Sequence, residues 1–365
     1  MERWKRTLWW SLWLSVFLGV TIVWSVTVGP VSVPAATVVQ AILNTVAIPT
    51  SVTVDPGTSA PIAHVPWVGI DVAFVHPFSF PVPRAKQIIV AQIRLPRIVL
   101  AAIVGFALAT AGTVMQGLFR NPMADPSVIG VSSGAAVGAV TLLVFGISVP
   151  FGLQGVAFLS ALITAFAVYL IATTNGRTPV ETLLLAGVAV QTFLGAVVSY
   201  LLLQAGESVN AVLHWLMGDL ATAGWDDVTG TLVLSLGSFA VLLVFAQDLN
   251  VLLLGEEQAQ TVGIDVERTK RILLTVATLA TAAAVSVAGV IGFVGLIVPH
   301  MLRLLVGPDH RVLLPTSAIA GAIFLVGTDT VARGGATQLP VGIVTAALGA
   351  PFFLYLLRQR EVHQL

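Results

Sequence analysis

The sequence is short of charged side chains and has no cysteine at all. Asp, Glu, Lys and Arg make up 9% of its 365 residues, whereas roughly 25% is usual in a soluble domain. A soluble protein of this length could not cover its surface with so few charges, so that class is excluded. Without cysteine the chain has no disulfides, no thiolate metal ligands and no cysteine nucleophile. The formal net charge of +0 gives no general attraction to nucleic acid.

Several motifs that carry chemistry are also missing. The sequence has no GxxxxGK[ST] phosphate loop and no HExxH motif. Its acidic residues fall near the ends of apolar segments, and Asp329 precedes Arg333 by four residues, a spacing that lets the two pair on one helix face. His300 lies within an apolar segment, where a lone histidine is more typical of packing than of proton transfer. An intramembrane enzyme and an ion-coupled carrier are therefore poorly supported.

Hydrophobic residues make up 57% of the chain and gather in segments of membrane-spanning length. We predict an all-α polytopic membrane protein with ten spans, formed by a single domain over residues 1–365. The first span follows a basic start like that of a signal peptide, but its apolar run is too long and no small-residue cleavage site follows. The eighth is the weakest, because Gly292, Gly295 and Pro299 interrupt it. The predicted spans are Leu8–Val28, Arg97–Phe119, Ser127–Ile147, Phe151–Thr173, Pro179–Gln204, Trp225–Gln247, Arg268–Gly289, Val290–Val306, Val312–Ala332 and Pro340–Leu357.

The distribution of Lys and Arg predicts the orientation of these spans in the membrane. With ten spans, both termini lie on the same side. If the termini lie inside, most Lys and Arg residues fall on the inner side, as is usual for membrane proteins. The short connections show this excess of basic residues most clearly. The outer side then holds Arg84, Lys86, Arg94, Arg97 and Arg333. We predict a cell-membrane protein with both termini in the cytoplasm.

Local sequence signals mark the starts and packing faces of several spans. Asp125 followed by Pro126 predicts a helix N-cap with proline at the first helical position. The run Thr178-Pro179-Val180-Glu181 predicts a capping box. Gly130, Gly134 and Gly138 recur at intervals of four, which predicts close packing against a neighbouring helix.

Two connections between spans are long. Residues 30–92 form a predicted external connection with a short helix near Ala36–Val46, followed by a proline- and glycine-rich, partly irregular stretch over Pro49–Pro83. Residues 249–267 form a predicted cytoplasmic connection, with an apolar lead-in at Val251–Leu254, a short helix over Glu256–Val262 and a stop at Gly263. A cytoplasmic segment this apolar packs either on the protein's own spans or on a partner.

Several strings in the chain match one known family. The matching strings are Arg94-Leu95-Pro96-Arg97, Gln116-Gly117-Leu118-Phe119-Arg120-Asn121-Pro122-Met123-Ala124-Asp125-Pro126, Gly130-Val131-Ser132-Ser133-Gly134-Ala135, Trp215-Leu216-Met217-Gly218, Leu254-Gly255-Glu256, Gly292-Phe293-Val294-Gly295-Leu296-Ile297-Val298-Pro299-His300, Leu339-Pro340-Val341-Gly342 and Leu348-Gly349-Ala350-Pro351-Phe352-Phe353. The chain resembles the permease subunits of type II ABC importers for iron chelates, haem and vitamin B12. The resemblance covers nearly the whole chain.

The resemblance implies a ten-span permease that forms a homodimer in the membrane lipid. Two separate ATP-binding subunits would dock in the cytoplasm and a substrate-binding protein outside, so no catalytic residue, cofactor, metal site or nucleic-acid contact is expected in this chain. It places the segment seated in the ATPase at Leu254, Gly255, Glu256, Ala259 and Gly263.

The resemblance also assigns roles elsewhere in the chain. Arg94, Arg97 and Arg333 match arginines that pair with carboxylates of the binding protein, although lipid-headgroup anchoring is the plainer alternative for Arg94 and Arg97. One departure is Gln338, where the family usually has Glu. Residues of the family motifs that we assign to helix packing are Gln116, Arg120, Asn121, Pro122, Asp125, Pro126, Gly130, Gly134, Pro299 and His300.

The few charges along the spans suit a bulky, nearly neutral cargo. We favour cobalamin (vitamin B12), with a ferric siderophore or haem as the alternative within the same family. An ion-coupled secondary carrier is the runner-up from another class.

Overall fold

The computed structural model describes residues 3–46, 48–58, 67–75, 77–150, 152–335 and 337–362. Its helices are α1 Arg3–Thr27, α2 Ala35–Asn44, α3 Arg84–Ile88, α4 Leu95–Leu118, α5 Val131–Phe145, α6 Gly152–Ala172, α7 Val180–Leu203, α8 Val209–Leu216, α9 Trp225–Val244, α10 Ala246–Leu252, α11 Glu256–Thr261, α12 Val266–Ala288, α13 Val294–Val306, α14 His310–Arg333 and α15 Val341–Val362. Two strands, β1 Ile48–Thr58 and β2 Trp67–Val75, complete the fold.

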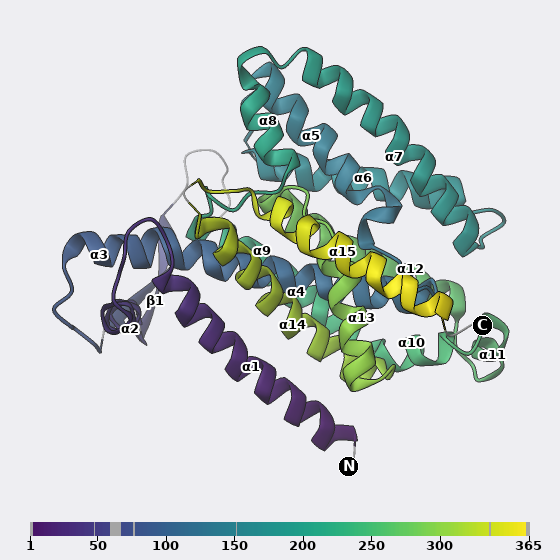
Figure 1. Ribbon diagram of the computed structural model, residues 1–365, viewed down its shortest axis with the longest axis horizontal. Helices are drawn as coiled ribbons and strands as arrows, with labels where there is room; N and C mark the ends of the chain where they lie inside the picture. Colours follow the sequence, from purple (N-terminus) through teal and green to yellow (C-terminus); the bar gives the residue numbers. More distant parts are fainter. Residues whose placement is uncertain are drawn as a thin grey trace.

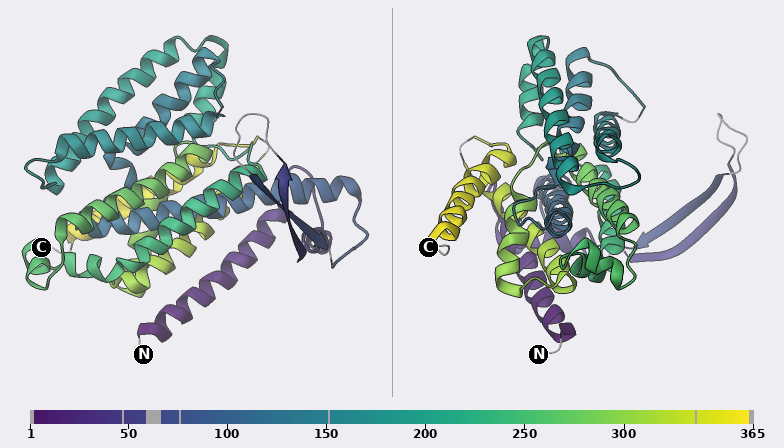
Figure 2. Two further views of the ribbon diagram at one scale, coloured as in Figure 1. Left: turned by 180° about the vertical axis from the view of Figure 1, so that it is seen from behind. Right: turned by 90° about the vertical axis from the view of Figure 1, so that its right-hand side faces the viewer.

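The long helices run roughly along one axis, so the bundle has two distinct ends (Figure 1). The first, here named the α11 end, carries α10, α11 and both termini. The second, here named the hairpin end, carries α2, α3 and the two strands, which project from the bundle (Figure 2). The segments that the sequence predicts to lie on opposite sides of a membrane therefore lie at opposite ends of the molecule.

Seven helices are long and apolar enough to cross a membrane, counted over the described residues. They are Trp4–Thr27, Arg84–Leu118, Gly152–Ala172, Val180–Leu203, Trp225–Val244, Val266–Ala288 and His310–Arg333. The other three predicted spans correspond to shorter apolar helices, Val131–Phe145, Val294–Val306 and Val341–Tyr355. The count of ten thus stays a prediction. The predicted start of the fourth span, Phe151, lies outside the described residues.

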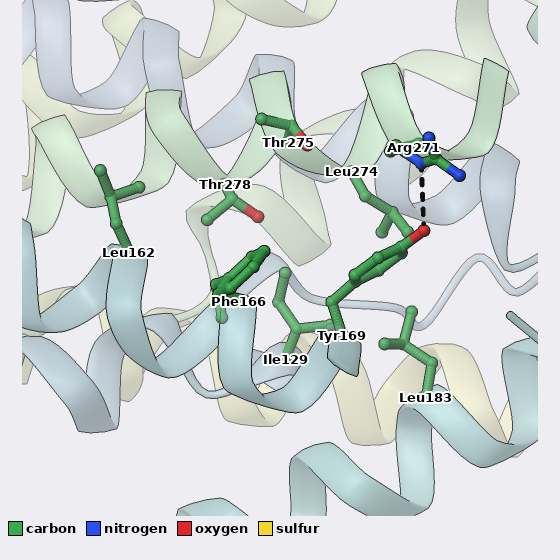
Figure 3. Close-up of a pocket in the computed structure, with 10 residues that line it drawn as sticks. Ile129, Leu162, Phe166, Tyr169, Leu183, Arg271, Leu274, Thr275 and Thr278 are labelled. Carbon is green, nitrogen blue, oxygen red and sulfur yellow. Dashed lines mark hydrogen bonds between the residues drawn. The ribbon is translucent and has the colours of Figure 1, made fainter. Parts of the chain in front are cut away.

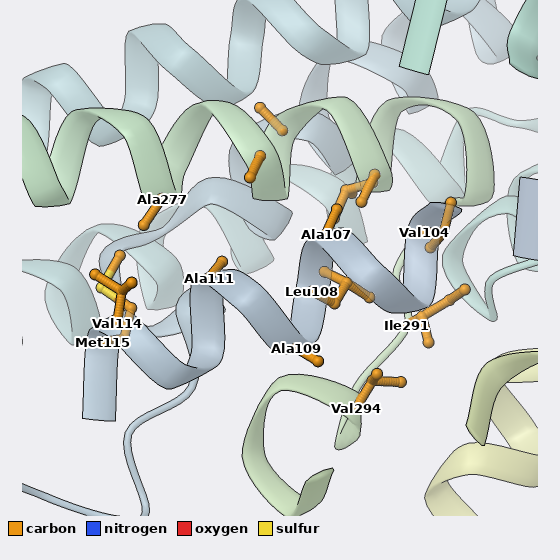
Figure 4. Close-up of a cluster of buried hydrophobic side chains, with 14 of the residues drawn as sticks. Val104, Ala107, Leu108, Ala109, Ala111, Val114, Met115, Ala277, Ile291 and Val294 are labelled. Carbon is orange, nitrogen blue, oxygen red and sulfur yellow. The ribbon is translucent and has the colours of Figure 1, made fainter. Parts of the chain in front are cut away.

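Helix α4 forms the centre of the bundle and is buried along nearly its whole length. Its small and medium side chains, among them Ala107 and Ala111, interlock with Ala277 of α12 and Val294 of α13 (Figure 4). Lipid tails are as apolar as these side chains, so close backbone packing rather than the hydrophobic effect holds such helices together. This explains why alanine and glycine are so common along α4.

Glycine pairs bring α4 into backbone contact with its neighbours. A Cβ atom on Gly105 would lie 2.2 Å from the carbonyl oxygen of Gly321 in α14, and one on Gly112 would lie 1.9 Å from that of Gly295 in α13. Both distances are far too short for real atoms, so only glycine fits at these crossings. Neither pair was predicted from the sequence.

The glycine face predicted on α5 is confirmed. A Cβ atom on Gly134 would lie 2.2 Å from Thr164 Oγ1 of α6, and one on Gly138 would lie 2.4 Å from Ser160 Oγ. The Asp125 N-cap is confirmed as well, since its carboxylate accepts a hydrogen bond from the backbone N–H of Ser127 at 2.8 Å. It caps a short 3-10 helix, Pro126–Ile129, ahead of α5.

Two local predictions are wrong. The predicted capping box at Thr178 is absent, because Pro179 is the N-cap of α7 and makes no side-chain cap. The Thr178 hydroxyl instead contacts the Thr173 hydroxyl at 2.9 Å, and the Thr178 backbone N–H donates to Glu267 Oε2 at 3.2 Å. A hydrogen bond to Glu267 of α12 therefore stands in place of the predicted cap within α7. The predicted eighth span is likewise shortened to the 13-residue α13.

The chain is mostly helical, as predicted, but the stretch Pro49–Pro83 is more regular than expected. Strands β1 and β2 pair antiparallel from Ile48 opposite Val75 to Thr58 opposite Trp67. Both segments are rich in β-branched residues, which are common in strands. The prolines that favoured irregular structure sit at the two register shifts, where a missing N–H is tolerated. The connecting residues 59–66 lie outside the described residues.

Gly112→Ala tests the packing of α4. The added methyl group must push the Gly295 backbone away, so we expect the free energy of unfolding to fall by about 1–3 kcal/mol. Thermal or denaturant unfolding of the purified protein in detergent measures this. Gly237→Ala in α9 is the matched control, since a Cβ atom there meets nothing within 4 Å. Equal stability of the two variants would contradict the central role of this crossing.

Candidate functional site

Two short helices, α10 and α11, form the connection between α9 and α12 at the α11 end. Leu249 and Leu252 of α10 are buried in the bundle. Asn250 Nδ2 donates to Asp309 Oδ1 at 2.7 Å, and Asn250 Oδ1 accepts from the backbone N–H of His310 at 2.8 Å. Helix α10 is therefore fixed to the start of α14.

The charge of Asp309 supports this attachment. Arg311 Nη2 lies 3.0 Å from Asp309 Oδ2, and Asp309 Oδ1 also caps the backbone N–H of Arg311 at 3.1 Å. Hydrogen bonding from Arg311, more than any other interaction, lowers the pKa of the Asp309 carboxyl to about 2. The carboxylate stays ionised at any physiological pH and keeps accepting from Asn250.

Helix α11 spans Glu256–Thr261, one residue shorter than the predicted Glu256–Val262, and Gly255 and Gly263 lie on either side of it. Gly255 has φ +133° and Gly263 has φ +89°, conformations that favour glycine. Ala259 is completely buried beneath the helix. In contrast, Leu254 is 72% exposed and Val262 is 67% exposed. The apolar side chains at the two edges of α11 thus face outward from a well-anchored helix.

A buried lysine ties α11 to the helices behind it. Lys270 Nζ, on α12, lies 3.2 Å from Glu256 Oε1 and 3.0 Å from Glu267 Oε1, and its side chain is 4% exposed. Glu267 also accepts the bond from Thr178 that precedes α7. This cluster joins α11, α12 and the start of α7, so a force on α11 acts on both long helices. The role of Lys270 was not predicted from the sequence, although its spacing of three from Glu267 is typical of an ion pair.

We name the exposed side of this region the α11 surface, defined by Leu254, Glu257, Gln258, Val262 and Gly263. All five residues are exposed. The surface combines two apolar side chains with one carboxylate and one amide. Such a mixture on a rigid support is typical of a protein-docking surface. Of the five residues assigned to coupling, Leu254 and Gly263 lie on it. Gly255 and Ala259 are buried, and the partly exposed Glu256 pairs with Lys270.

The three arginines assigned to docking lie at the hairpin end, but inside the bundle. Arg94, Arg97 and Arg333 are between 4% and 6% exposed. Asp329 is fully buried between two of them, with Arg97 Nη2 at 2.8 Å and Arg333 Nε at 2.9 Å. The predicted pairing of Asp329 with Arg333 is confirmed. This ion-pair cluster holds α4 and α14 together.

Further hydrogen bonds complete the cluster. Arg94 donates to the backbone oxygens of Val26, at 2.6 Å, and Val31. Arg333 Nη2 donates to Ser25 Oγ at 2.7 Å. Both arginines thereby fasten the end of α1. An arginine that docks a partner or anchors in lipid headgroups would be exposed, whereas all three side chains are buried. Docking by these arginines stays a prediction.

Gln338 belongs to the same cluster. Its Oε1 accepts a hydrogen bond from Arg97 Nη1 at 3.3 Å. Gln338, which stands where the family usually has Glu, therefore contacts Arg97, one of the arginines assigned to docking. With glutamine there, Asp329 is the carboxylate that pairs with these arginines in the described part of the chain.

The remaining motif residues surround a break between α12 and α13. The backbone from Gly289 to Phe293 is not helical, and Phe293 has φ +70°. Gln116 Nε2, from the end of α4, donates to the carbonyl oxygens of Leu296 at 2.9 Å and Gly295 at 3.3 Å. Irregular backbone at membrane depth requires such internal partners.

Two more family motifs close on this break. A Cβ atom on Gly218 would lie 2.6 Å from the oxygen of Val290, and one on Gly289 would lie 2.2 Å from that of Trp215. A Cβ atom on Gly342 would lie 2.0 Å from the oxygen of Met217. The start of α15 and the end of α8 therefore touch the break through backbone contacts that only glycine allows.

Other motif residues shape the turn from α4 into α5. Arg120, with φ +47°, and Asn121 are exposed there, and Asn121 Oδ1 accepts from the backbone N–H of Met123 at 3.0 Å. Pro122 is half-buried and Pro126 is buried in the same turn. Pro299 is buried within α13 and His300 beside it is half-buried. Among the described residues, no group of three or more His, Asp or Glu side chains could hold a metal ion.

Comparison with known proteins matches this arrangement to one family. The model of the FecCD transport family matches residues 16–359. The cobalamin import system permease protein BtuC of Halobacterium salinarum is 55% identical over 367 aligned positions, which cover 100% of both chains. The hemin transport system permease protein HmuU of Yersinia pestis is 41% identical, over 75% of this chain and 82% of that protein.

A solved structure shows the same fold. A metal-chelate type ABC transporter in an inward-facing conformation superposes with a TM-score of 0.76 at 29% identity, covering 96% of this chain and 98% of the other. The extent of these matches leads to one conclusion: the chain is a multi-pass membrane permease that belongs to the FecCD transport family.

Proposed function

We propose that the chain is the membrane-spanning subunit of an ATP-driven importer. It would act as a homodimer, with two ATP-binding subunits at the α11 end and a substrate-binding protein at the hairpin end. The observation that carries this proposal is the α11 surface, where Leu254 and Val262 are exposed on a helix anchored by Lys270. A permease without a phosphate-binding loop needs a separate ATPase, and this surface offers a place to transmit its movement.

We propose ten spans with both termini in the cytoplasm. The short helices α5, α13 and α15 would complete the seven longer ones. The arrangement in Figure 1 supports this topology, because both termini and α11 lie at the same end. The basic residues Arg120, Arg177, Arg268 and Arg271 belong to connections or helix starts at that end, in agreement with the positive-inside rule.

We propose cobalamin as the cargo. The relative that aligns over its full length carries a cobalamin permease name, whereas the haem relative aligns over three quarters of this chain. Haem or a ferric siderophore is the second candidate. Uptake into proteoliposomes that contain the permease, its ATPase and its binding protein decides between them, with labelled cobalamin, haem and ferric chelates supplied in turn. Uptake that needs an ion gradient rather than ATP would favour a secondary carrier instead.

Leu254→Asp tests the α11 surface. We expect it to weaken binding of the ATPase subunit at least tenfold, because losing an apolar anchor of an interface commonly costs about 2 kcal/mol or more. Phe78→Asp is the control, since Phe78 is 40% exposed but lies at the hairpin end. Binding is measured between detergent-purified components. Unchanged affinity for Leu254→Asp would remove α11 from the coupling interface.

Asp329→Asn tests the buried cluster. It leaves Arg97 and Arg333 without a carboxylate in the interior, so we expect the free energy of unfolding to fall by about 3–5 kcal/mol. Asp226→Asn, an exposed position at the start of α9, is the matched control. Unfolding of the permease alone is the measurement. If both variants were equally stable, the arginines would have no structural role, and docking to a binding protein would be their remaining role.

A further inference from the structure

A cavity of about 320 Å³ lies between α6, α7 and α12, near the 3-10 helix Pro126–Ile129 (Figure 3). We name it the α6–α12 groove. Most of its wall is apolar, formed by Ile129, Leu162, Phe166, Leu183 and Leu274. Phe166 is 62% exposed, so the groove opens on the side of the bundle rather than at either end.

One end of the groove is cationic. Arg271 of α12 is exposed, and its Nε donates to the Tyr169 hydroxyl at 3.2 Å (Figure 3). Its two terminal nitrogens make no hydrogen bond to the part of the chain that the structure describes. Two carboxylates, those of Asp265 and Glu267, act on Arg271 through space. Glu267 is already bound to Lys270 and to the Thr178 backbone, so the guanidinium keeps donors for a ligand.

The groove has a fixed polarity along the bundle axis. Arg271 lies in the second turn of α12 at the α11 end, whereas Thr275 and Thr278 follow one and two turns deeper. On α6, Phe166 and then Leu162 lie farther from the α11 end than Tyr169 does. Leu162 and Tyr169 are about 10 Å apart along the helix axis, at 1.5 Å per residue. With the membrane topology proposed above, the charge would lie at the depth of the headgroups and the apolar wall would extend into the bilayer.

We propose that the α6–α12 groove binds one anionic phospholipid from the membrane. The lipid phosphate would lie against Arg271 and the Tyr169 hydroxyl, and one acyl chain would lie along Phe166 and Leu162. A guanidinium with free donors selects a phosphate, and a basic pocket between spans on the cytoplasmic side is a setting in which anionic headgroups bind. The lipid would bridge α6 and α12 at Arg271, the residue that follows Lys270 in α12. This proposal goes beyond transport and does not depend on the cargo.

Native mass spectrometry of the purified full-length chain tests it. Delipidated protein is titrated with phosphatidylglycerol and, separately, with phosphatidylcholine. We expect one tightly held phosphatidylglycerol per chain, and about tenfold weaker binding for Arg271→Gln, as expected for a lost charge-assisted hydrogen bond. Arg268→Gln is the matched control, since Arg268 is exposed one turn earlier on α12 but does not line the groove. That variant should bind as the unchanged chain does.

A photoactivatable group at position 166 identifies the occupant in vesicles of phosphatidylglycerol and phosphatidylcholine. Crosslinks to phosphatidylglycerol support the proposal. Three results would overturn it: equal binding of the two lipids, equal loss for Arg271→Gln and Arg268→Gln, or crosslinks to a second copy of the chain. None of these measurements requires transport, so their outcome is independent of the proposed import function.

Discussion

The backbone contact between α4 and its neighbours is the constraint on which the rest of the structure depends. In lipid, apolar side chains gain little by meeting one another, so helices stay together where their surfaces fit closely. Gly105 and Gly112 let α14 and α13 approach α4 to the distance at which main chains touch. These contacts also bring Arg97 within reach of Asp329 at one end of α4, and Gln116 within reach of Leu296 at the other.

The two ends of the bundle use charge in different ways. At the hairpin end, one carboxylate joins two arginines in an interior site that ties α4 to α14, while the neighbouring arginine fastens α1. At the α11 end, Lys270 joins two carboxylates that remain partly exposed. The first arrangement stabilises the fold away from solvent. The second lies just behind the α11 surface, where a docked partner would act on it.

Much of this architecture could be predicted from the sequence, because its signals are local. Apolar runs located the long helices, Gly263 marked the end of α11, and the Asp329–Arg333 spacing indicated their pair. What could not be predicted depends on residues distant in the chain. The Thr178 hydrogen bond goes to Glu267 instead of its own helix, and the burial of Arg94 and Arg97 depends on where α1 and α14 lie. The strand pair was missed because prolines were weighed above β-branched residues.

The break between α12 and α13 has a mechanical consequence. In a continuous helix, a change of tilt must distort or open intrahelical hydrogen bonds. Here α12 ends at Ala288 and α13 begins at Val294, so the two rods are joined by five residues that carry no helical ladder. Rotation about those backbone bonds alone can reorient one rod against the other. The permease therefore contains a joint with no helical hydrogen bonds to break, held in its present arrangement by Gln116 and by the glycine contacts to α8 and α15.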